Sequence, residues 1–416
     1  MEDTAAATLP YDIILDILLR VSTDSAALFR CAAASKQWRA FIADRAFLKR
    51  CWTENGGRPS SHLGYLIQQR RDEEDIDSPY PPLFVPPLES MLGARPRLLT
   101  DFLSCEPDGL LDGAQPLAAR HGLVVVRLFR GVRGNAVHMA VCDLPAGTCN
   151  MLPELRLRCE ASSISCTILA AQDYPSSSLE AKRPSSLDLG YYSAVFKLLT
   201  LVVSGHKGDH SEECNLYTFS SAELTWGSPT KCFDKMSGIS RGGFSMLQQK
   251  HDNPVVCRGV VHWLAWYLSE AGASPKYYSL DVSAETYLIS LTEISGPVHR
   301  YGYNGKMLPI LGVSADGSLA MFRQRKELDI IEMWTRESGV WLYTKGIKFN
   351  VGIRPCARMW PEEKGGTFLI VDNSWCVRRV DIANLRTEVE KFPGGIGLEA
   401  MPVNVDWPVL FLSLLG

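Results

Sequence analysis

A strand-like unit recurs along most of the chain, and this repeat limits the fold more than any other feature of the sequence. In one half of the unit a glycine precedes an apolar run that predicts a buried inner strand, as in 122–126, 259–264, 317–322 and 366–371. In the other half an apolar strand runs into a small polar turn, at intervals of roughly 50 to 75 residues. The anchor positions of this second half are Asp143, Phe219, Asp281, Trp334 and Asp381. A repeat of that length predicts the four-stranded blades of a β-propeller.

The number of blades depends on the segments at the two ends of the repeat region. Five units are readable directly, residues 98–117 supply part of another, and residues 403–412 are the candidate strand that closes the ring. The sequence therefore predicts six blades, with seven blades and a packed pair of β-sheets as the alternatives. Two insertions, 175–188 and 229–254, lengthen the intervals and predict surface loops that carry recognition on one face of the ring.

Residues 1–55 follow a helical pattern instead. Apolar residues recur at helical spacing over 13–21, with charged residues on the opposite side. Pro10 lies in the first turn, where its missing N–H costs nothing. Two further helical stretches surround Leu28 and Trp38. The sequence thus predicts a small module of three short helices.

The rest of the chain divides into a connector and a large β domain. Residues 56–87 combine glycine, proline and a charged run, which predicts a solvated linker. Residues 88–416 carry the repeat and predict one β domain. The predicted fold class is therefore mainly β with a small N-terminal α module.

Composition excludes several classes of protein. The chain has 416 residues, of which 46% are hydrophobic and 21% charged, so it is long enough and apolar enough to fold around a sizeable core. Its net charge of −3 gives no global positive field that would attract nucleic acid. No apolar run approaches the roughly 20 residues of a membrane helix, and the first residues do not resemble a secretory signal. We expect a protein inside the cell, without a nucleic-acid or membrane partner.

The twelve cysteines are scattered and include no CxxC pair, so we expect reduced thiols and no zinc. His206 and His210 lie near Glu212 and Cys214, but the flanking glycines indicate a flexible loop, where this spacing does not form a ligand pair. No nucleophile elbow, Walker loop or HExxH motif is present. We therefore predict no metal, no cofactor and no catalytic residue.

Five tryptophans fall at or beside the repeat, and two readings of them are open. They could form a stacking surface for sugars or bases, or pack between blades, and the second use is commoner at repeat positions. His262 and His121, within or beside predicted strands, are likewise expected to be hydrogen-bonded core or channel residues. The tryptophans are Trp226, Trp263, Trp334, Trp341 and Trp375.

The helical module carries a known motif. Its Leu-Pro start and acidic helix over 9–21, the Lys-x-Trp-Arg signature within 34–39, and the Phe-Leu pair at 47–48 resemble the F-box motif in the expected order. One position departs from the family pattern, because Ser22 stands where the family usually has proline. Residues 56–416 resemble, more weakly, the F-box-associated propeller-type regions of plant F-box proteins, especially those of grasses.

This resemblance implies a substrate-recognition adaptor of an SCF-type ubiquitin ligase, in which the F-box binds a Skp-type adaptor and the β domain binds the protein to be ubiquitylated. Such a subunit is not itself an enzyme, and it acts in the cytosol or the nucleus. A three-helix segment buries little surface alone, which favours stabilisation by a partner. The residues expected to contact the adaptor are Leu9, Pro10, Ile13, Ile14, Ile17, Leu18, Leu28 and Trp38.

Two alternatives remain open at this stage. The same apolar residues could close only the core of the helical module, since aromatic and aliphatic anchors serve both cores and interfaces. A propeller that binds a small ligand or carbohydrate, or an enzyme, is the competing function, and a convergent set of acids, histidines or metal ligands at the ring centre would favour it. The target protein is not readable from the sequence.

Overall fold

The computed structural model of the 416-residue chain describes the helices, the strands and many of the turns. The described residues are 10–21, 25–44, 47, 62–69, 81–86, 95–103, 109–129, 135–144, 146–159, 161–170, 173–174, 196–205, 212–232, 244–245, 254–267, 276–294, 309–325, 330–348, 358–361, 367–371, 376–381, 387–391 and 398–405.

Three helices open the described chain, as predicted: α1 (Tyr11–Val21), α2 (Ser25–Ala34) and α3 (Lys36–Ile42). α1 begins directly after Pro10, whose carbonyl oxygen accepts hydrogen bonds from two backbone N–H groups of the first turn at 3.1 Å. Acidic Asp12 in its first turn and basic Arg20 in its last turn complement the helix dipole. Helix type and order therefore follow from local sequence.

Six four- or five-stranded antiparallel sheets follow the helices. Blade 1 contains β27 (Leu398–Asn404), β1 (His62–Gln69), β2 (Leu83–Val85) and β3 (Arg97–Leu98), which is followed by the 3₁₀ helix η1 (Leu99–Phe102). Blade 2 contains β4 (Gln115–Arg120), β5 (Leu123–Leu128), β6 (Ala136–Asp143), β7 (Thr148–Met151) and β8 (Leu155–Arg156). Blade 3 contains β9 (Ala161–Leu169), β10 (Lys197–Gly205), β11 (Glu212–Ser220), β12 (Thr225–Trp226) and β13 (Thr230–Lys231).

The remaining three sheets follow the same order along the chain. Blade 4 contains β14 (Phe244–Ser245), β15 (Val255–Cys257), β16 (Val260–Tyr267), β17 (Lys276–Ser283) and β18 (Ile289–Glu293). Blade 5 contains β19 (Ile310–Val313), β20 (Leu319–Arg325), β21 (Ile330–Glu337) and β22 (Val340–Lys348). Blade 6 contains β23 (Arg358–Pro361), β24 (Thr367–Val371), β25 (Cys376–Asp381) and β26 (Thr387–Lys391).

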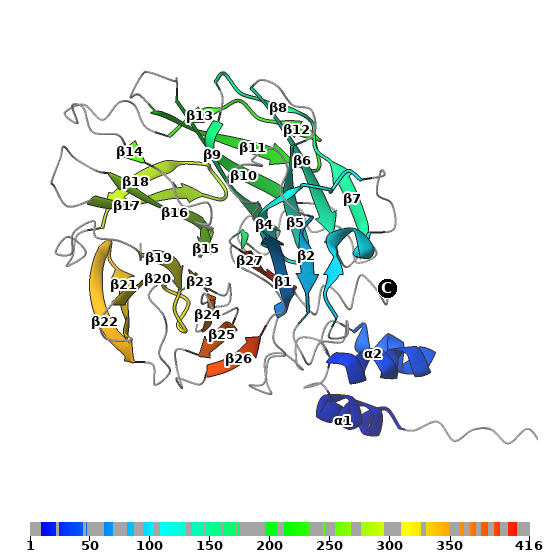
Figure 1. Ribbon diagram of the computed structural model, residues 1–416. Helices are drawn as coiled ribbons and strands as arrows, with labels where there is room; N and C mark the ends of the chain where they lie inside the picture. The colour runs from blue at the N-terminus through cyan, green and yellow to red at the C-terminus, as the bar shows by residue number, and fades with distance from the viewer. Residues whose placement is uncertain are drawn as a thin grey trace, which may run out of the picture.

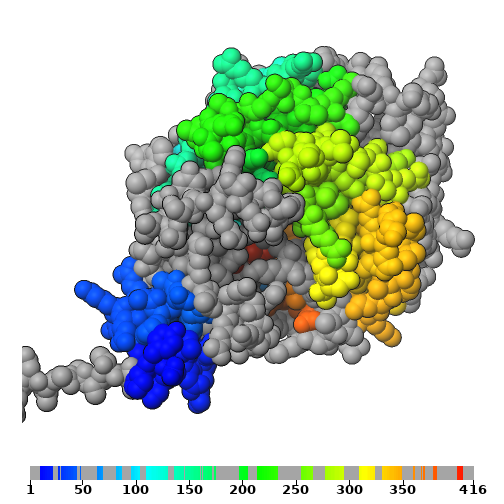
Figure 2. Space-filling view, turned by 180° about the vertical axis from the view of Figure 1, so that it is seen from behind, coloured from blue at the N-terminus to red at the C-terminus, as the bar shows by residue number. Residues whose placement is uncertain are grey.

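The six sheets stand around a common centre and form a six-bladed β-propeller, which confirms the favoured blade number (Figure 1). Strands β27, β15 and β23 lie near the centre, whereas β7, β22 and β26 lie towards the rim. Figure 2 shows that the helices stand out at the rim of the ring and do not cover its middle.

The ring is closed by strands from the two ends of the described β region. β27 pairs antiparallel with β1 over most of its length, with Met401 opposite Leu66. The backbone of blade 2 joins the closure, because Gly122 N–H donates to the Asn404 carbonyl at 2.8 Å. The pairing covers the inner edge of β1, and β27 becomes the innermost strand of blade 1. The closing strand was predicted over 403–412, and it lies at 398–404.

The segment predicted as a linker contributes two strands of blade 1. β1 and β2 lie inside residues 56–87, and β1 is buried over residues 63–68. A methyl group added at Gly64 would lie 2.5 Å from Phe84 Cζ and 2.6 Å from the Val85 carbonyl oxygen, which shows how tightly the two strands pack. The linker prediction was wrong for these strands because the flanking charged and proline-rich stretches obscured a short apolar run.

The glycine-led runs are the second strands of their blades, not the innermost ones. β5, β16, β20 and β24 are buried as predicted, but β4 lies against β27 and β9, and β19 lies against β23, so the first strands line the centre. His121 and Gly122 join β4 to β5 with φ values of 55° and 81°. Positive φ at both positions is typical of a type I′ hairpin turn, which explains the glycine at the start of this run.

Alternation of strand direction places the long connections on two faces. We name the face at which β1 begins and β27 ends the entry face; the turn between β4 and β5 lies there too. The connection from β9 to β10, which includes 175–188, therefore leaves the entry face, and the connection from β13 to β14, within 229–254, leaves the opposite face. The described strands on either side of the two insertions therefore end on different faces. The insertions themselves lie mostly outside the described residues, so the prediction that they serve one recognition face stays a prediction.

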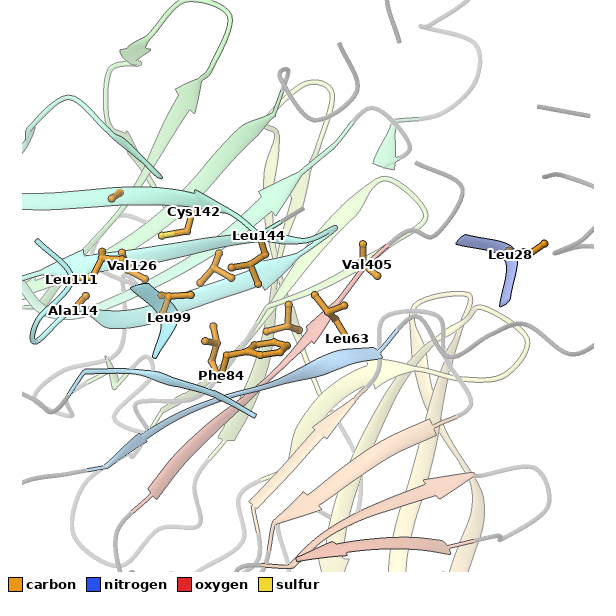
Figure 3. Close-up of a cluster of buried hydrophobic side chains, with 14 of the residues drawn as sticks. Leu28, Leu63, Phe84, Leu99, Leu111, Ala114, Val126, Cys142, Leu144 and Val405 are labelled. Carbon is orange, nitrogen blue, oxygen red and sulfur yellow. The ribbon is translucent and has the colours of Figure 1, made fainter. Parts of the chain in front are cut away.

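Apolar side chains of the helices and of blades 1 and 2 belong to one buried cluster. It joins Ile14, Leu18 and Leu28 of the helices to residues such as Leu63 and Phe84 of blade 1. Figure 3 shows the blade part of this cluster, with Leu28 at some distance from it. None of the described helices has the length and hydrophobicity that a membrane crossing requires.

Candidate functional site

The outward side of α1 is the most exposed apolar surface of the helical module in the described chain. Tyr11 is 56% exposed and Ile13 is 47% exposed, and Pro10 beside them is exposed as well. The Tyr11 ring makes an edge-on contact with Phe41 of α3, with ring centroids 4.8 Å apart, which holds α1 against α3. Pro10, Ile13 and Ile17 follow one another at spacings of three and four residues and therefore share one side of the helix, which forms a surface that a partner groove can cover. We name Pro10, Ile13 and Ile17 the α1 surface.

Three residues predicted to contact an adaptor lie in the core instead. Ile14 is 1% exposed, and Leu18 and Leu28 are fully buried. A side chain without accessible area cannot contact a partner, so the burial of these three residues favours a role in the core of the helical module. The physical reason is the four-residue spacing of Ile14 and Leu18, which places both on the inner side of an 11-residue helix.

The other predicted contact residues have mixed positions. Ile17 and Trp38 are half-buried, and Trp38 packs against the apolar cluster of the helices. Leu9 lies outside the described residues. Asp16 and Arg20 form an exposed ion pair of 2.9 Å on the same helix, which contributes little stability but adds charge beside the α1 surface.

The propeller tryptophans pack within and between blades. Trp263, Trp334 and Trp341 are buried, and Trp263 Nε1 donates a hydrogen bond of 3.1 Å to Ser165 Oγ in the neighbouring blade. Trp226 is half-buried against the Phe219 ring at 5.3 Å. These contacts favour packing between and within blades over a surface on which sugars or bases stack. Trp375 lies outside the described residues.

A buried polar cluster joins blades 4 and 5 around Asp281 on β17. Its carboxylate lies 2.7 Å from His262 Nδ1, accepts a hydrogen bond of 2.6 Å from Arg336 Nη1 on β21, and accepts another from the Ser279 hydroxyl. Arg336 Nη2 also donates to Thr292 Oγ1 at 3.0 Å. Burial by itself raises the pKa of Asp281, but the hydrogen bonds and the charge of its partners outweigh burial and hold this pKa below its ordinary value. The cluster therefore works as an ion-paired link between two blades.

A second buried cluster joins blades 2 and 3 around Asp173. Arg120 of β4 donates two hydrogen bonds of 3.0 Å to its carboxylate and another to the Ile168 carbonyl. His121 Nε2 lies 3.5 Å from Asp173, and the Ala170 N–H donates to Asp173 at 2.8 Å. Burial alone raises the pKa of Asp173, whereas the hydrogen bond from His121 and the Arg120 charge lower it well below its ordinary range.

Sequence reasoning found part of these clusters. It singled out Asp281 as a repeat anchor and expected His262 and His121 to be hydrogen-bonded, as they are. It missed Arg120 and Asp173. A charged residue in a strand pattern is expected to face solvent, and only the packing of blade 2 against blade 3 shows that these two side chains pair with each other. Within the described parts of the chain, no group of three or more His, Cys, Asp or Glu side chains is arranged to hold a metal ion.

The helical module matches a known protein family. A family model described as the F-box domain matches residues 7–50, which include all three helices. Residues 7–50 are an F-box domain. The F-box covers about a tenth of the chain, and the propeller that follows it is assigned from its strand pairings. No curated protein matches the chain.

Solved structures similar to the chain are distant from it. A protein from Lactobacillus plantarum shares 9% identity over 81% of this chain and 99% of its own, with a TM-score of 0.38. A putative 6-phosphogluconolactonase from Bacteroides uniformis shares 9% identity over 80% of this chain and 83% of its own, with a TM-score of 0.39. TolB from Acinetobacter baumannii shares 11% identity over 84% of this chain and 69% of its own, with a TM-score of 0.36. Scores this low give no information about the activity of this chain.

Proposed function

We propose that the chain is the substrate-recognition subunit of an SCF-type ubiquitin ligase. The F-box at residues 7–50 binds a Skp-type adaptor, and the propeller binds the protein that is to be ubiquitylated. The subunit has no catalytic role of its own, and it meets its partners inside the cell. The observation that carries this proposal is the F-box domain placed directly ahead of a closed six-bladed propeller.

The position of the F-box supports adaptor binding. The helices stand out at the rim of the ring, so a partner reaches them without displacing a blade (Figure 2). The α1 surface supplies exposed apolar area on an ordered helix, and docking would remove this area from water. The buried residues Ile14, Leu18 and Leu28 hold the shape of the module instead of contacting the adaptor.

The propeller supports the second half of the proposal. Ion-paired clusters tie blade 2 to blade 3 and blade 4 to blade 5, and so fix the relative positions of these neighbouring blades, which can carry recognition loops. An arrangement of this kind suits recognition of a folded or extended protein target.

Substitution of Ile13 by aspartate tests the proposal. Ile13 is 47% exposed, so Ile13→Asp leaves the F-box core intact while it places a charge in the predicted apolar contact. We expect recovery of a Skp-type adaptor with the full chain to fall at least tenfold, as for the loss of an interface anchor worth about 2 kcal/mol. Recovery is measured by co-purification at equal amounts of folded protein.

Met151→Asp is the matched control, since Met151 on β7 is also 47% exposed but belongs to blade 2. This control should keep adaptor recovery at the level of the unsubstituted chain. Equal recovery by the folded Ile13→Asp protein would remove α1 from the interface. Loss of recovery in both variants would show that the F-box alone does not account for adaptor binding.

A further inference from the structure

Two cysteines face each other across the outer hairpin of blade 2. Cys142 on β6 lies directly opposite Cys149 on β7, and their sulfur atoms are 3.5 Å apart, within hydrogen-bond distance. No disulfide joins them in the structure. The two residues flank the turn that follows Asp143, and the antiparallel register fixes their pairing.

The backbone at this pair suits a covalent link. Leu152 N–H donates to the Met139 carbonyl at 2.9 Å, which makes 139 and 152 a hydrogen-bonded pair. Pairs alternate along an antiparallel ladder, so three steps further on Cys142 and Cys149 form a non-hydrogen-bonded pair. Such pairs bring Cα atoms to about 4.5 Å, within the span that a disulfide accepts.

The two thiols differ in access. Cys142 is fully buried in the apolar cluster of blades 1 and 2, where Figure 3 shows it between Val126 and Leu144. Cys149 packs against the same cluster but is only partly buried, on the rim strand β7. A small oxidant therefore reaches Cys149 first, and Cys142 lies behind it as a second thiol.

We propose that Cys142 and Cys149 form a reversible, peroxide-driven disulfide on the rim of blade 2. The Cys149 thiolate attacks one oxygen of hydrogen peroxide, the O–O bond breaks, and hydroxide leaves, so Cys149 becomes a sulfenic acid. The Cys142 sulfur then attacks the Cys149 sulfur, the S–S bond forms, the S–O bond breaks, and the hydroxide leaves as water with the Cys142 proton. With hydrogen peroxide, two thiols lose two electrons and two protons in total, and the peroxide is reduced to two waters.

The bond would tie the rim strand β7 to β6 at the turn of the hairpin. Cys142 belongs to the same apolar cluster as Ile14, Leu18 and Leu28 of the F-box helices, so the bond would form within a blade that shares its core with the F-box. This site is independent of the proposed ligase role, since it concerns only the hairpin and a small oxidant.

Peptide mapping of the full chain tests the proposal. Trypsin releases residues 134–156 as one peptide that contains only these two cysteines. After treatment with hydrogen peroxide and alkylation without reduction, we expect this peptide to lose two hydrogen atoms and to accept no alkyl group. Dithiothreitol should restore both thiols.

Two variants separate the roles of the cysteines. Cys142→Ser should abolish the loss of two hydrogens and let the Cys149 sulfenic acid accumulate, detected with a sulfenic-acid probe such as dimedone. Cys232→Ser, at a half-buried thiol of blade 3, is the matched control and should leave the disulfide yield unchanged. The proposal is overturned if peptide 134–156 keeps two alkylated cysteines, or if Cys149 gains oxygen without forming the bond, at a peroxide dose that oxidises Cys232.

Discussion

Asp281 holds a negative charge where little of its side chain reaches water, and its ion pair with Arg336 crosses from blade 4 to blade 5. Its folded-state pKa lies below the ordinary value of 3.8. Between those two values the unfolded chain binds the proton and the folded chain does not, so stability is present above pH 3.8 and is lost as the pH falls through the folded pKa. We expect Asp281→Asn to lower the free energy of unfolding near pH 7 by about 1–3 kcal/mol, because Arg336 and His262 lose a charged partner.

The pH profile separates this effect from a general loss of packing. Asp281→Asn should lose less stability than the unsubstituted chain when the pH is lowered from 5 towards 3, measured by denaturant unfolding. Asp112→Asn, at an exposed carboxylate, is the control and should change neither the stability nor its slope with pH. Equal acid sensitivity in the Asp281→Asn and unsubstituted proteins would show that Asp281 does not link the two blades.

At the scale of the element, strand β1 depends on a close approach at Gly64. Because a Cβ there would meet Phe84 Cζ at 2.5 Å and the Val85 carbonyl oxygen at 2.6 Å, Gly64→Ala forces β1 and β2 apart. We expect a loss of about 1–3 kcal/mol in the free energy of unfolding. Gly339→Ala is the comparison, since that site has open space and a φ of 85°, so it should cost only about 1 kcal/mol of backbone strain. A larger loss at Gly339 than at Gly64 would contradict the packing of β1 against β2.

The elements that the sequence predicts well are those whose pattern is local. The three helices follow from apolar spacing and Pro10, and the blade number follows from the repeated turns that anchor at positions such as Asp143 and Asp281. β1 and β2 are short and lie between charged stretches, so their membership in blade 1 depends on pairing with β27 at the other end of the chain. Pairing over that distance leaves no local pattern.

The residues of the candidate sites also differ in how far local sequence predicts them. Helical spacing shows that Ile13, Ile14 and Leu18 are apolar positions of one helix, but only the packing of α1 on α2 and α3 decides which of them is exposed. Cys142 and Cys149 flank a turn that the repeat predicts, so their pairing could have been inferred from the hairpin register. The Arg120–Asp173 ion pair joins two blades and could not have been inferred before those blades were placed together.

At the scale of the whole molecule, the closing strand β27 holds the ring. It supplies the innermost strand of blade 1, lies against β4 of blade 2, and places Val403 in the apolar cluster shared with the F-box helices. A chain that ends at residue 397 lacks this strand and leaves one edge of β1 unpaired and the Leu66 and Phe84 side chains less covered. We expect this truncated chain to associate at micromolar concentration and to lose its cooperative thermal transition, measured by light scattering and calorimetry.

A chain that ends at residue 405 keeps the pairing of β27 with β1 and is the matched control, expected to stay monodisperse. If the shorter chain also stays monodisperse and melts at the temperature of the control, β27 does not close the ring, because its loss would expose the edge of β1 and favour association.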